Sequence, residues 1–219
     1  MTREKRVAGE PRPQAERSAA STKAMLDAAI ELILDKGAKV SMMAIGERSG
    51  FSHGLVLARF GSKGALLEAV AREAQRRFAD SVAAISDGAT GLAKLHAIID
   101  AYLRTPTADE HAFYILLGES LGPEPHLHAA FARADTSFRR YVQHTLEDAQ
   151  QLGQIDASIE PATAAVLFVG MFRGIATQYL VNSDAVEMKA LRAAAHDMVS
   201  RYVAPDHVAP DHQENSTCT

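Results

Sequence analysis

The chain has 219 residues, 47% hydrophobic and 23% charged, which is ordinary for a globular protein of one large or two modest domains. No uncharged apolar run reaches ~18 residues and the N-terminus lacks an apolar segment, so we expect no membrane span, no signal peptide and a cytoplasmic protein. Residues 1–86 carry 14 Lys and Arg against 10 Asp and Glu, a net charge of +4. Residues 87–219 carry 9 Lys and Arg against 17 Asp and Glu, a net charge of −8. This asymmetry favours a nucleic-acid-binding part joined to an acidic remainder.

Both ends of the chain are expected to be disordered. Residues 1–17 are charged and interrupted by prolines, and they are either a plain terminus, which we favour because three acidic residues dilute the basic ones, or a basic arm that adds DNA contacts. Residues 204–219 have no apolar periodicity. Their His207 and His212 each follow an aspartate, but a flexible proline-rich tail does not preorganise a metal site.

A helix-turn-helix is predicted near the N-terminus. Helical periodicity predicts a first helix that starts near residues 18–22 and ends at Gly37. Two short helices follow at about 42–49 and 52–60, separated by a turn that contains Gly50, and a serine begins each of them, where its hydroxyl can cap the first turn. This spacing is typical of a helix-turn-helix, whose second helix enters the major groove of DNA. We therefore expect residues 18–64 to form a DNA-binding domain.

The rest of the chain is predicted to be helical. Apolar periodicity indicates a long helix over about 63–86 and further helices over about 92–104, 109–121, 126–152, 161–180 and 184–203. No β-alternating run with strand-type turns occurs. The predicted fold is all-α with about nine helices, in which residues 65–203 form a helical ligand-binding and dimerisation domain.

A set of short motifs occurs in a specific order: Gly37, Ile45 followed by Ser49-Gly50-Phe51-Ser52, Phe60-Gly61-Ser62-Lys63, and Ala65-Leu66-Leu67. In this order and spacing, roughly residues 20–75 resemble the TetR/AcrR family of bacterial transcriptional regulators. The resemblance implies a homodimer that binds a palindromic operator, usually as a repressor, and releases the DNA when a small molecule enters the C-terminal domain.

The second short helix carries most of the expected DNA contacts. Val56 and Phe60 should point inward, whereas His53 and Arg59 are the side chains able to donate hydrogen bonds to base edges. Lys63 resembles the phosphate-binding lysine of the family. The complete set of expected DNA-binding residues is Ser41, Arg48, Ser52, His53, Gly54, Leu55, Leu57, Ala58, Arg59 and Lys63.

Leu55 and Leu57 depart from the family pattern, which usually has Thr or Ser at the first position and a phosphate-contacting Tyr at the second. Both leucines remove hydroxyl donors. Either the affinity for the DNA backbone is lower or rests on Arg48, Arg59 and Lys63, or an altered pose of the helix buries the two leucines.

The C-terminal helices contain more apolar residues than one buried stripe needs, so some of them are available for an effector cavity or a dimer face. Arg173 interrupts an apolar run and is either a charge at the rim of the dimer interface, which we favour, or a partner for an acidic ligand. Gly170 and Gly174 would allow helices to approach closely in a homodimer. The expected ligand-binding residues are Phe113, Leu117, Phe138, Tyr141, Phe168, Met171 and Phe172.

We therefore expect a ligand-responsive transcriptional regulator whose partners are double-stranded operator DNA, an unidentified small-molecule effector and a second copy of the chain, with no cofactor, metal or membrane partner. An enzyme is disfavoured because the sequence has no nucleophile elbow, zinc motif or phosphate loop. The alternative is a ligand-sensing helical protein with weakened or lost DNA recognition, which Leu55 and Leu57 keep open.

Overall fold

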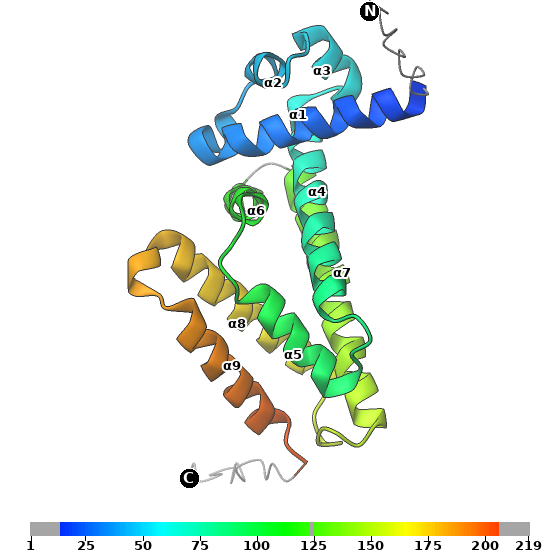
Figure 1. The fold of residues 1–219 in the computed structure, drawn as a ribbon, viewed down its shortest axis with the longest axis vertical. Coiled ribbons are helices and arrows are strands. Elements are labelled where there is room, and N and C mark those ends of the chain that lie inside the picture. Colours follow the sequence, from blue (N-terminus) through cyan, green and yellow to red (C-terminus); the bar gives the residue numbers. More distant parts are fainter. Residues whose placement is uncertain (1–13, 123–124, 206–219) are drawn as a thin grey trace, which may run out of the picture. The chain divides into compact units, whose positions relative to one another are not determined.

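The computed structural model describes residues 14–122 and 125–205, and within them the chain forms nine α-helices, two short 3-10 turns and no β-strand (Figure 1). The predicted all-α fold is confirmed. Residues 1–13, 123–124 and 206–219 lie outside the described residues. The first thirteen residues of the expected arm, and His207 and His212 of the expected tail, belong to these segments.

The chain divides into two compact units. The first comprises the described residues up to Ala74 and those between Ala112 and Ala130, and the second comprises Gln75–His111 and the described residues from Phe131 onward. Helices α4 (Lys63–Ile85), α6 (Ala108–Ser120) and α7 (Pro125–Gln151) contribute residues to both units. The assignment of DNA binding to residues 18–64 and of ligand binding to residues 65–203 stays a prediction.

The first unit packs three N-terminal helices around the beginning of α4. Helix α1 (Gln14–Lys36) leads through a 3-10 turn, η1 (Gly37–Lys39), to α2 (Met42–Ser49) and α3 (His53–Phe60), and α2 contacts both α1 and α3 (Figure 1). The predicted bounds of the two short helices are thus confirmed to within a residue. Fully buried apolar side chains from every helix form the core, among them Met25, Ile33, Ile45, Val56, Leu66 and Val70.

Helix α1 begins at Gln14, at least four residues before the predicted start at residues 18–22. The expectation that residues 14–17 are disordered is therefore wrong. These residues are Gln, Ala, Glu and Arg, which all have good helix propensity, and Glu16 lies in the first turn, where a negative charge interacts favourably with the helix dipole. Because all four residues are exposed, they show no apolar periodicity, and the sequence pattern did not predict that the helix includes them.

The second unit is built from α5 (Gly91–Tyr102), α8 (Pro161–Val181) and α9 (Met188–Val203) with the adjoining parts of α4 and α7, and a 3-10 turn, η2 (Ser183–Ala185), connects α8 to α9. Helix α5 contacts both α8 and α9 (Figure 1). Pro161 occupies the first position of α8, as predicted, and the Glu160 carboxylate accepts hydrogen bonds from the amides of Ala162 and Thr163. One apolar cluster forms the core of this unit, with Leu95, Ile98, Leu146, Phe172 and Val199 fully buried.

Helix α8 is long and apolar enough, by length and composition, to cross a membrane. Arg173 interrupts its apolar sequence, so the helix contains no uncharged apolar run of ~18 residues, which was the basis for expecting no membrane span. One face of α8 lies in the core through Ala165, Phe168, Val169 and Phe172. The opposite face exposes Val166 at 49% and Leu167 at 54% of their surfaces, so this helix has an apolar face that the described part of the chain does not cover.

Candidate DNA interface and effector site

The geometry of the helix-turn-helix follows from serine caps and two glycines. The hydroxyls of Ser41 and Ser52 accept hydrogen bonds, both of 3.2 Å, from amides in the first turns of α2 and α3. Gly50 ends α2 in the left-handed region with φ of 78°, a conformation that favours glycine. At Gly46 an added Cβ would lie 2.7 Å from the carbonyl oxygen of Phe51, so only glycine permits the turn to fold back against α2.

The side chains of α3 divide sharply between core and solvent. Val56 is completely buried and Phe60 is half-buried. All ten residues predicted to bind DNA are exposed, so the structure brings them to the surface of the first unit. Leu55 and Leu57 expose 40% and 43% of their surfaces. The hypothesis that an altered pose of α3 buries these leucines is therefore wrong.

Two of the predicted DNA-binding arginines have partners inside the first unit. Arg48 forms an ion pair with Glu31, 3.0 Å between Nη1 and Oε2, with about half of each side chain exposed. Arg59 donates from Nη1 to the hydroxyl of Ser18 at 2.6 Å. An exposed ion pair of this kind contributes only about 0–1 kcal/mol, so a phosphate can replace Glu31 at little cost. Both arginines are thus held beside the helix-turn-helix and remain available.

Lys63 lies exposed at the first position of α4. Ser62 precedes it and accepts a hydrogen bond of 3.1 Å from the amide of Ala65. The N-terminal end of a helix attracts anions because its first amides lack intrahelical acceptors and its dipole is positive there. The lysine ammonium and this helix end together suit an anion.

An aromatic cluster occupies the second unit. Tyr102 of α5 lies within 5.0 to 5.6 Å, between ring centroids, of Phe78 on α4, Phe138 on α7 and Phe172 on α8. Phe138 also stacks on Tyr141, and Phe172 on Phe168. Phe78, Tyr102, Phe138 and Tyr141 are only partly buried. We call these six residues the aromatic cluster; four of them (Phe138, Tyr141, Phe168 and Phe172) are among the predicted ligand-binding residues.

The other predicted ligand-binding residues lie elsewhere. Met171 packs, partly buried, against the core of the second unit. Phe113 and Leu117 lie on α6 within the first unit, half-buried, and Phe113 contacts the ring of Tyr114. The sequence predicted one set of ligand contacts, but the structure gathers four of its members and assigns Phe113 and Leu117 to the other compact unit.

Arg173 turns toward its own unit beside the aromatic cluster. Its Nη1 donates to Oδ1 of Asp135, a hydrogen bond also links it to Tyr102, and 22% of its side chain is exposed. Burial disfavours the charged guanidinium, but Tyr102 and Asp135 outweigh this effect and raise the pKa of Arg173 above its ordinary value. Both contacts lie within the second unit, and the role of Arg173 at the rim of a dimer interface, which the sequence alone favoured, or as a partner for an acidic ligand stays a prediction.

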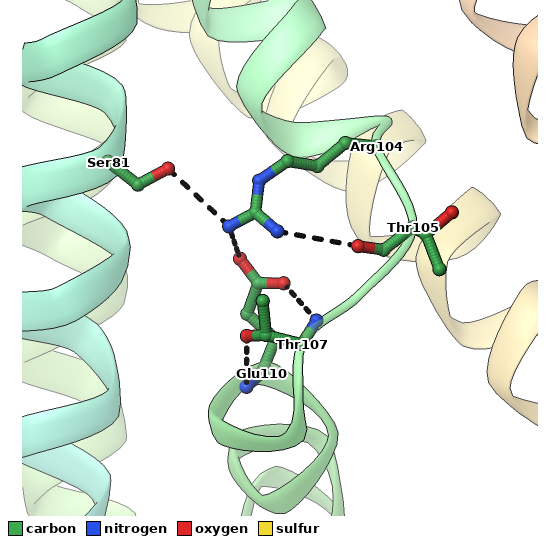
Figure 2. Close-up of polar contacts among 5 residues, drawn as sticks. All are labelled: Ser81, Arg104, Thr105, Thr107 and Glu110. Carbon is green, nitrogen blue, oxygen red and sulfur yellow. Dashed lines mark hydrogen bonds and ion pairs between the residues drawn. The ribbon is translucent and has the colours of Figure 1, made fainter.

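A polar cluster joins the end of α5 to α4 and to the first turn of α6 within the second unit (Figure 2). Arg104 donates to Glu110 at 2.7 Å and to Ser81 of α4 at 3.4 Å. The second carboxylate oxygen of Glu110 accepts from the amide of Thr107 at 2.7 Å, and the hydroxyl of Thr107 accepts from the amide of Glu110 at 3.4 Å, which is a capping box. A neighbouring ion pair of 2.8 Å joins Arg77 of α4 to Asp109 of α6.

Titratable side chains also meet where α5 contacts α9. The rings of His96 and His196 pack edge to face with centroids 4.8 Å apart. His196 Nε2 lies 2.9 Å from Asp100 Oδ1, and His96 Nε2 lies 3.0 Å from the hydroxyl of Ser200. Burial first, and then the neighbouring His196, hold the pKa of His96 below its ordinary value, against the opposing effect of Asp100. Among the described residues, no group of three or more His, Cys, Asp or Glu side chains has a metal-binding arrangement.

Two families of known proteins match this chain along its length. Residues 25–70 match the family of bacterial regulatory proteins described as the tetR family, and residues 91–204, more than half of the chain, match the C-terminal part of BetI-type transcriptional repressors. The chain belongs to the TetR family of bacterial transcriptional regulators. It is a DNA-binding transcriptional regulator, as the resemblance of its N-terminal motifs predicted.

Solved structures share the TetR-family fold at low sequence identity. A TetR-family transcriptional regulator from Rhodococcus sp. matches with a TM-score of 0.74 and 18% identity, over 83% of this chain and 97% of that one. A transcriptional regulator from Saccharomonospora viridis in complex with choline gives 0.73 and 19%, over 84% and 98%. The complex of SmeT with triclosan gives 0.72 and 19%, over 87% and 94%. No curated protein matches the chain.

Three residues that contact the expected DNA-binding arginines and Arg173 were not identified from the sequence. Glu31 and Ser18 hold the two arginines near α3, and Asp135 holds Arg173. Their partners are distant in the chain, so nothing in the local sequence pairs them. Gly46 did carry a local signal, because a glycine inside a helical pattern costs about 1 kcal/mol and usually has a packing reason.

Proposed function

We propose that this TetR-family regulator is a cytoplasmic homodimeric repressor that binds a palindromic operator and releases it when a small, largely apolar effector enters the second unit. The observation that carries the proposal is helix α3, of which every residue expected to contact DNA is exposed while Val56 is completely buried. An exposed helix supported from behind by a packed core can enter the major groove without rearrangement.

The expected DNA contacts are of two kinds, to base edges and to phosphates. His53 and Arg59 donate hydrogen bonds to base edges, with guanine as the favoured partner of arginine. Leu55 and Ala58 contact thymine methyl groups, and Gly54 allows close approach. Lys63, Arg48 and the exposed serine caps contact phosphates. Because Arg48 is held only by an exposed ion pair, it exchanges Glu31 for a phosphate on binding.

The effector binds in the second unit beside the aromatic cluster. Partly buried rings next to a few polar side chains suit a small apolar molecule with one polar group. The structures of related fold in complex with choline and with triclosan support the proposal that this unit senses a small molecule.

Effector binding shifts a population of conformations rather than creating a new one. Helix α4 has residues in both units, and Arg77, Ser81 and their partners tie its C-terminal half to the α5–α6 junction. A change at the aromatic cluster therefore reaches α4 through Phe78 and these polar contacts. The two reading helices of a dimer must stay about one helical turn of DNA apart, so a small pivot of α4 releases the operator.

A DNA-protection experiment tests the proposal against a ligand sensor that has lost DNA recognition. Leu55 and Leu57 favour this alternative because they cannot donate to phosphates. Protection of the region upstream of the protein's own gene should show two half-sites about one helical turn apart, and Arg59→Ala should abolish it. A protein that binds small molecules but protects no DNA at low salt would establish the alternative.

A further inference from the structure

Three buried side-chain nitrogens among the described residues have no hydrogen-bond partner: Gln75 Nε2, Arg139 Nε and Arg173 Nε. All three belong to the second unit. Arg139 and Arg173 directly follow Phe138 and Phe172 of the aromatic cluster, and Gln75 lies one helical turn before its Phe78. A buried donor without an acceptor costs about 1–3 kcal/mol, so these groups mark a place where an acceptor is missing.

Two arginines share one carboxylate beside the aromatic cluster. Asp135 faces two guanidinium groups: Arg173 donates to its Oδ1, and Arg139 Nε lies 2.7 Å from its Oδ2. The second distance is that of an ion pair, but the Nε–H of Arg139 is not aligned for a hydrogen bond. A third cation, Lys94, lies 4.9 Å from the centre of the Tyr141 ring. Asp135 is therefore shared between two guanidinium groups, and a third cation lies on a ring of the same cluster.

Asp135 holds Arg173 by one nitrogen, Nη1, and leaves its Nε–H without an acceptor. A guanidinium binds a carboxylate most strongly through two parallel N–H donors. A second carboxylate can therefore bind Arg173 better than Asp135 does. An organic cation would meet two guanidinium groups and a Tyr141 ring already occupied by Lys94.

We propose that the effector is an organic anion, in which an apolar or aromatic body packs against the aromatic cluster and a carboxylate binds the guanidinium of Arg173 in place of Asp135. This inference rests on the proposed function, because it names the chemical class of the molecule that the second unit senses. Asp135 acts as an internal stand-in that neutralises Arg173 when no effector is bound, and it competes with the effector.

Binding to the full chain should be measured by calorimetry with probes that share a body and differ in head group. Suitable probes are 3-phenylpropanoate, 2-naphthylacetate and decanoate, the three corresponding amides, and 3-phenylpropyl-trimethylammonium. At least one carboxylate should bind tenfold or more tightly than its amide, and the cation should not bind. Tighter binding of the amides or the cation, or no binding by any of the three carboxylates, overturns the inference.

Two substitutions with opposite expected effects separate binding from general damage to the fold. Arg173→Gln should weaken the best carboxylate at least tenfold and its amide hardly at all, whereas Asp135→Asn should strengthen the carboxylate several-fold by removing its competitor. Arg140→Gln removes the same charge at an exposed position of α7 and should change neither affinity. If Arg173→Gln fails to fold, the sign of the Asp135→Asn effect decides, and weaker carboxylate binding there contradicts the proposal.

Operator release distinguishes failure of this inference from failure of the proposed function. If amides bind and release protected DNA while carboxylates do neither, the proposed repressor function stands. The proposal that the effector is an organic anion is then wrong. If carboxylate binding depends on Arg173 but no DNA is bound or released, the proposed anion site stands. The proposed regulatory function is then wrong.

Discussion

Lys63 shows how single residues in the first unit combine with backbone geometry. Its ammonium lies at an exposed position beside the N-terminal turn of α4, whose Ala65 amide is capped by Ser62. An exposed lysine beside a helix N-terminus suits a phosphate and carries no sequence information. His53 and Arg59, both exposed on α3, are the side chains proposed to read bases.

Replacing Lys63 with alanine should remove one phosphate contact. The plot of log affinity for an operator fragment against log salt concentration should then become shallower by roughly one unit, equally for matched and mismatched sequences. Lys189→Ala, at an exposed position of α9, changes the net charge equally and serves as the control. Equal slopes for the parent protein and Lys63→Ala would remove Lys63 from the phosphate contacts.

His96 should make the stability of the second unit depend on pH. Its pKa in the folded protein lies below the ordinary value of 6.5, mainly through burial and then through His196, so the unfolded chain binds a proton more readily. The free energy of unfolding should therefore fall as the pH drops below about 6.5 and level off once the folded protein is protonated too. Urea unfolding between pH 7.5 and 5 measures this fall, and His96→Gln should reduce it. A fall of the same size in the variant would assign the effect to other groups.

At the scale of elements, the helix-turn-helix depends on two glycines with opposite roles. An added Cβ at Gly46 meets the Phe51 carbonyl oxygen at 2.7 Å, whereas at Gly54 the nearest atom is Ser52 Oγ at 4.0 Å. Gly46 therefore lets the turn close, while Gly54 lies open on the outward face of α3.

Gly46→Ala should destabilise the protein by about 1–3 kcal/mol because the turn must open to admit the methyl group. Gly54→Ala should leave stability unchanged or raise it by up to about 1 kcal/mol, since alanine favours the helix, but it should weaken operator binding. Thermal unfolding and a binding titration measure the two effects. If Gly46→Ala unfolds at the same temperature as the parent protein, the role assigned to Gly46 in closing the turn is wrong.

The α5–α6 junction should depend on Glu110, whose two carboxylate oxygens bind Arg104 and the amide of Thr107. Glu110→Ala removes both contacts from a side chain that is 14% exposed, and we expect a loss of about 1–3 kcal/mol in stability. Asp197→Ala breaks an exposed ion pair with Arg201 and should cost less than about 0.5 kcal/mol. Equal losses in thermal unfolding would show that the junction contributes no more than a surface pair.

At the scale of the whole molecule, sequence reasoning gave the helices and the outward face of α3, because apolar periodicity, serine caps and glycine stops are local signals. It did not give the start of α1, whose first turn is exposed and held by propensity alone. Nor did it give the pairing of Arg173 with Asp135 or the gathering of Tyr102 with Phe78, because contacts between α4, α5, α7 and α8 join residues distant in the chain. Only the packing of the second unit brings these residues together.

The uncovered face of α8 leads to a prediction about assembly. Leu167, Gly170 and Gly174 are exposed and lie at helical spacing on one side, where the glycines leave room for a close neighbour. A second copy of the chain can cover this face, and removing its apolar surface from water favours association. The parent protein should have twice the mass of one chain in light scattering at micromolar concentration.

Leu167→Glu should convert this dimer to a folded monomer, because the new carboxylate would be buried against its copy without a partner. Because the proposed operator holds two half-sites, the monomer should also lose most of its operator affinity. Leu152→Glu is the matched control, because Leu152 is equally exposed, at 56% against 54%, but lies at the end of α7. A parent protein that is already monomeric, or a Leu167→Glu variant that remains dimeric, would show that α8 does not form the interface.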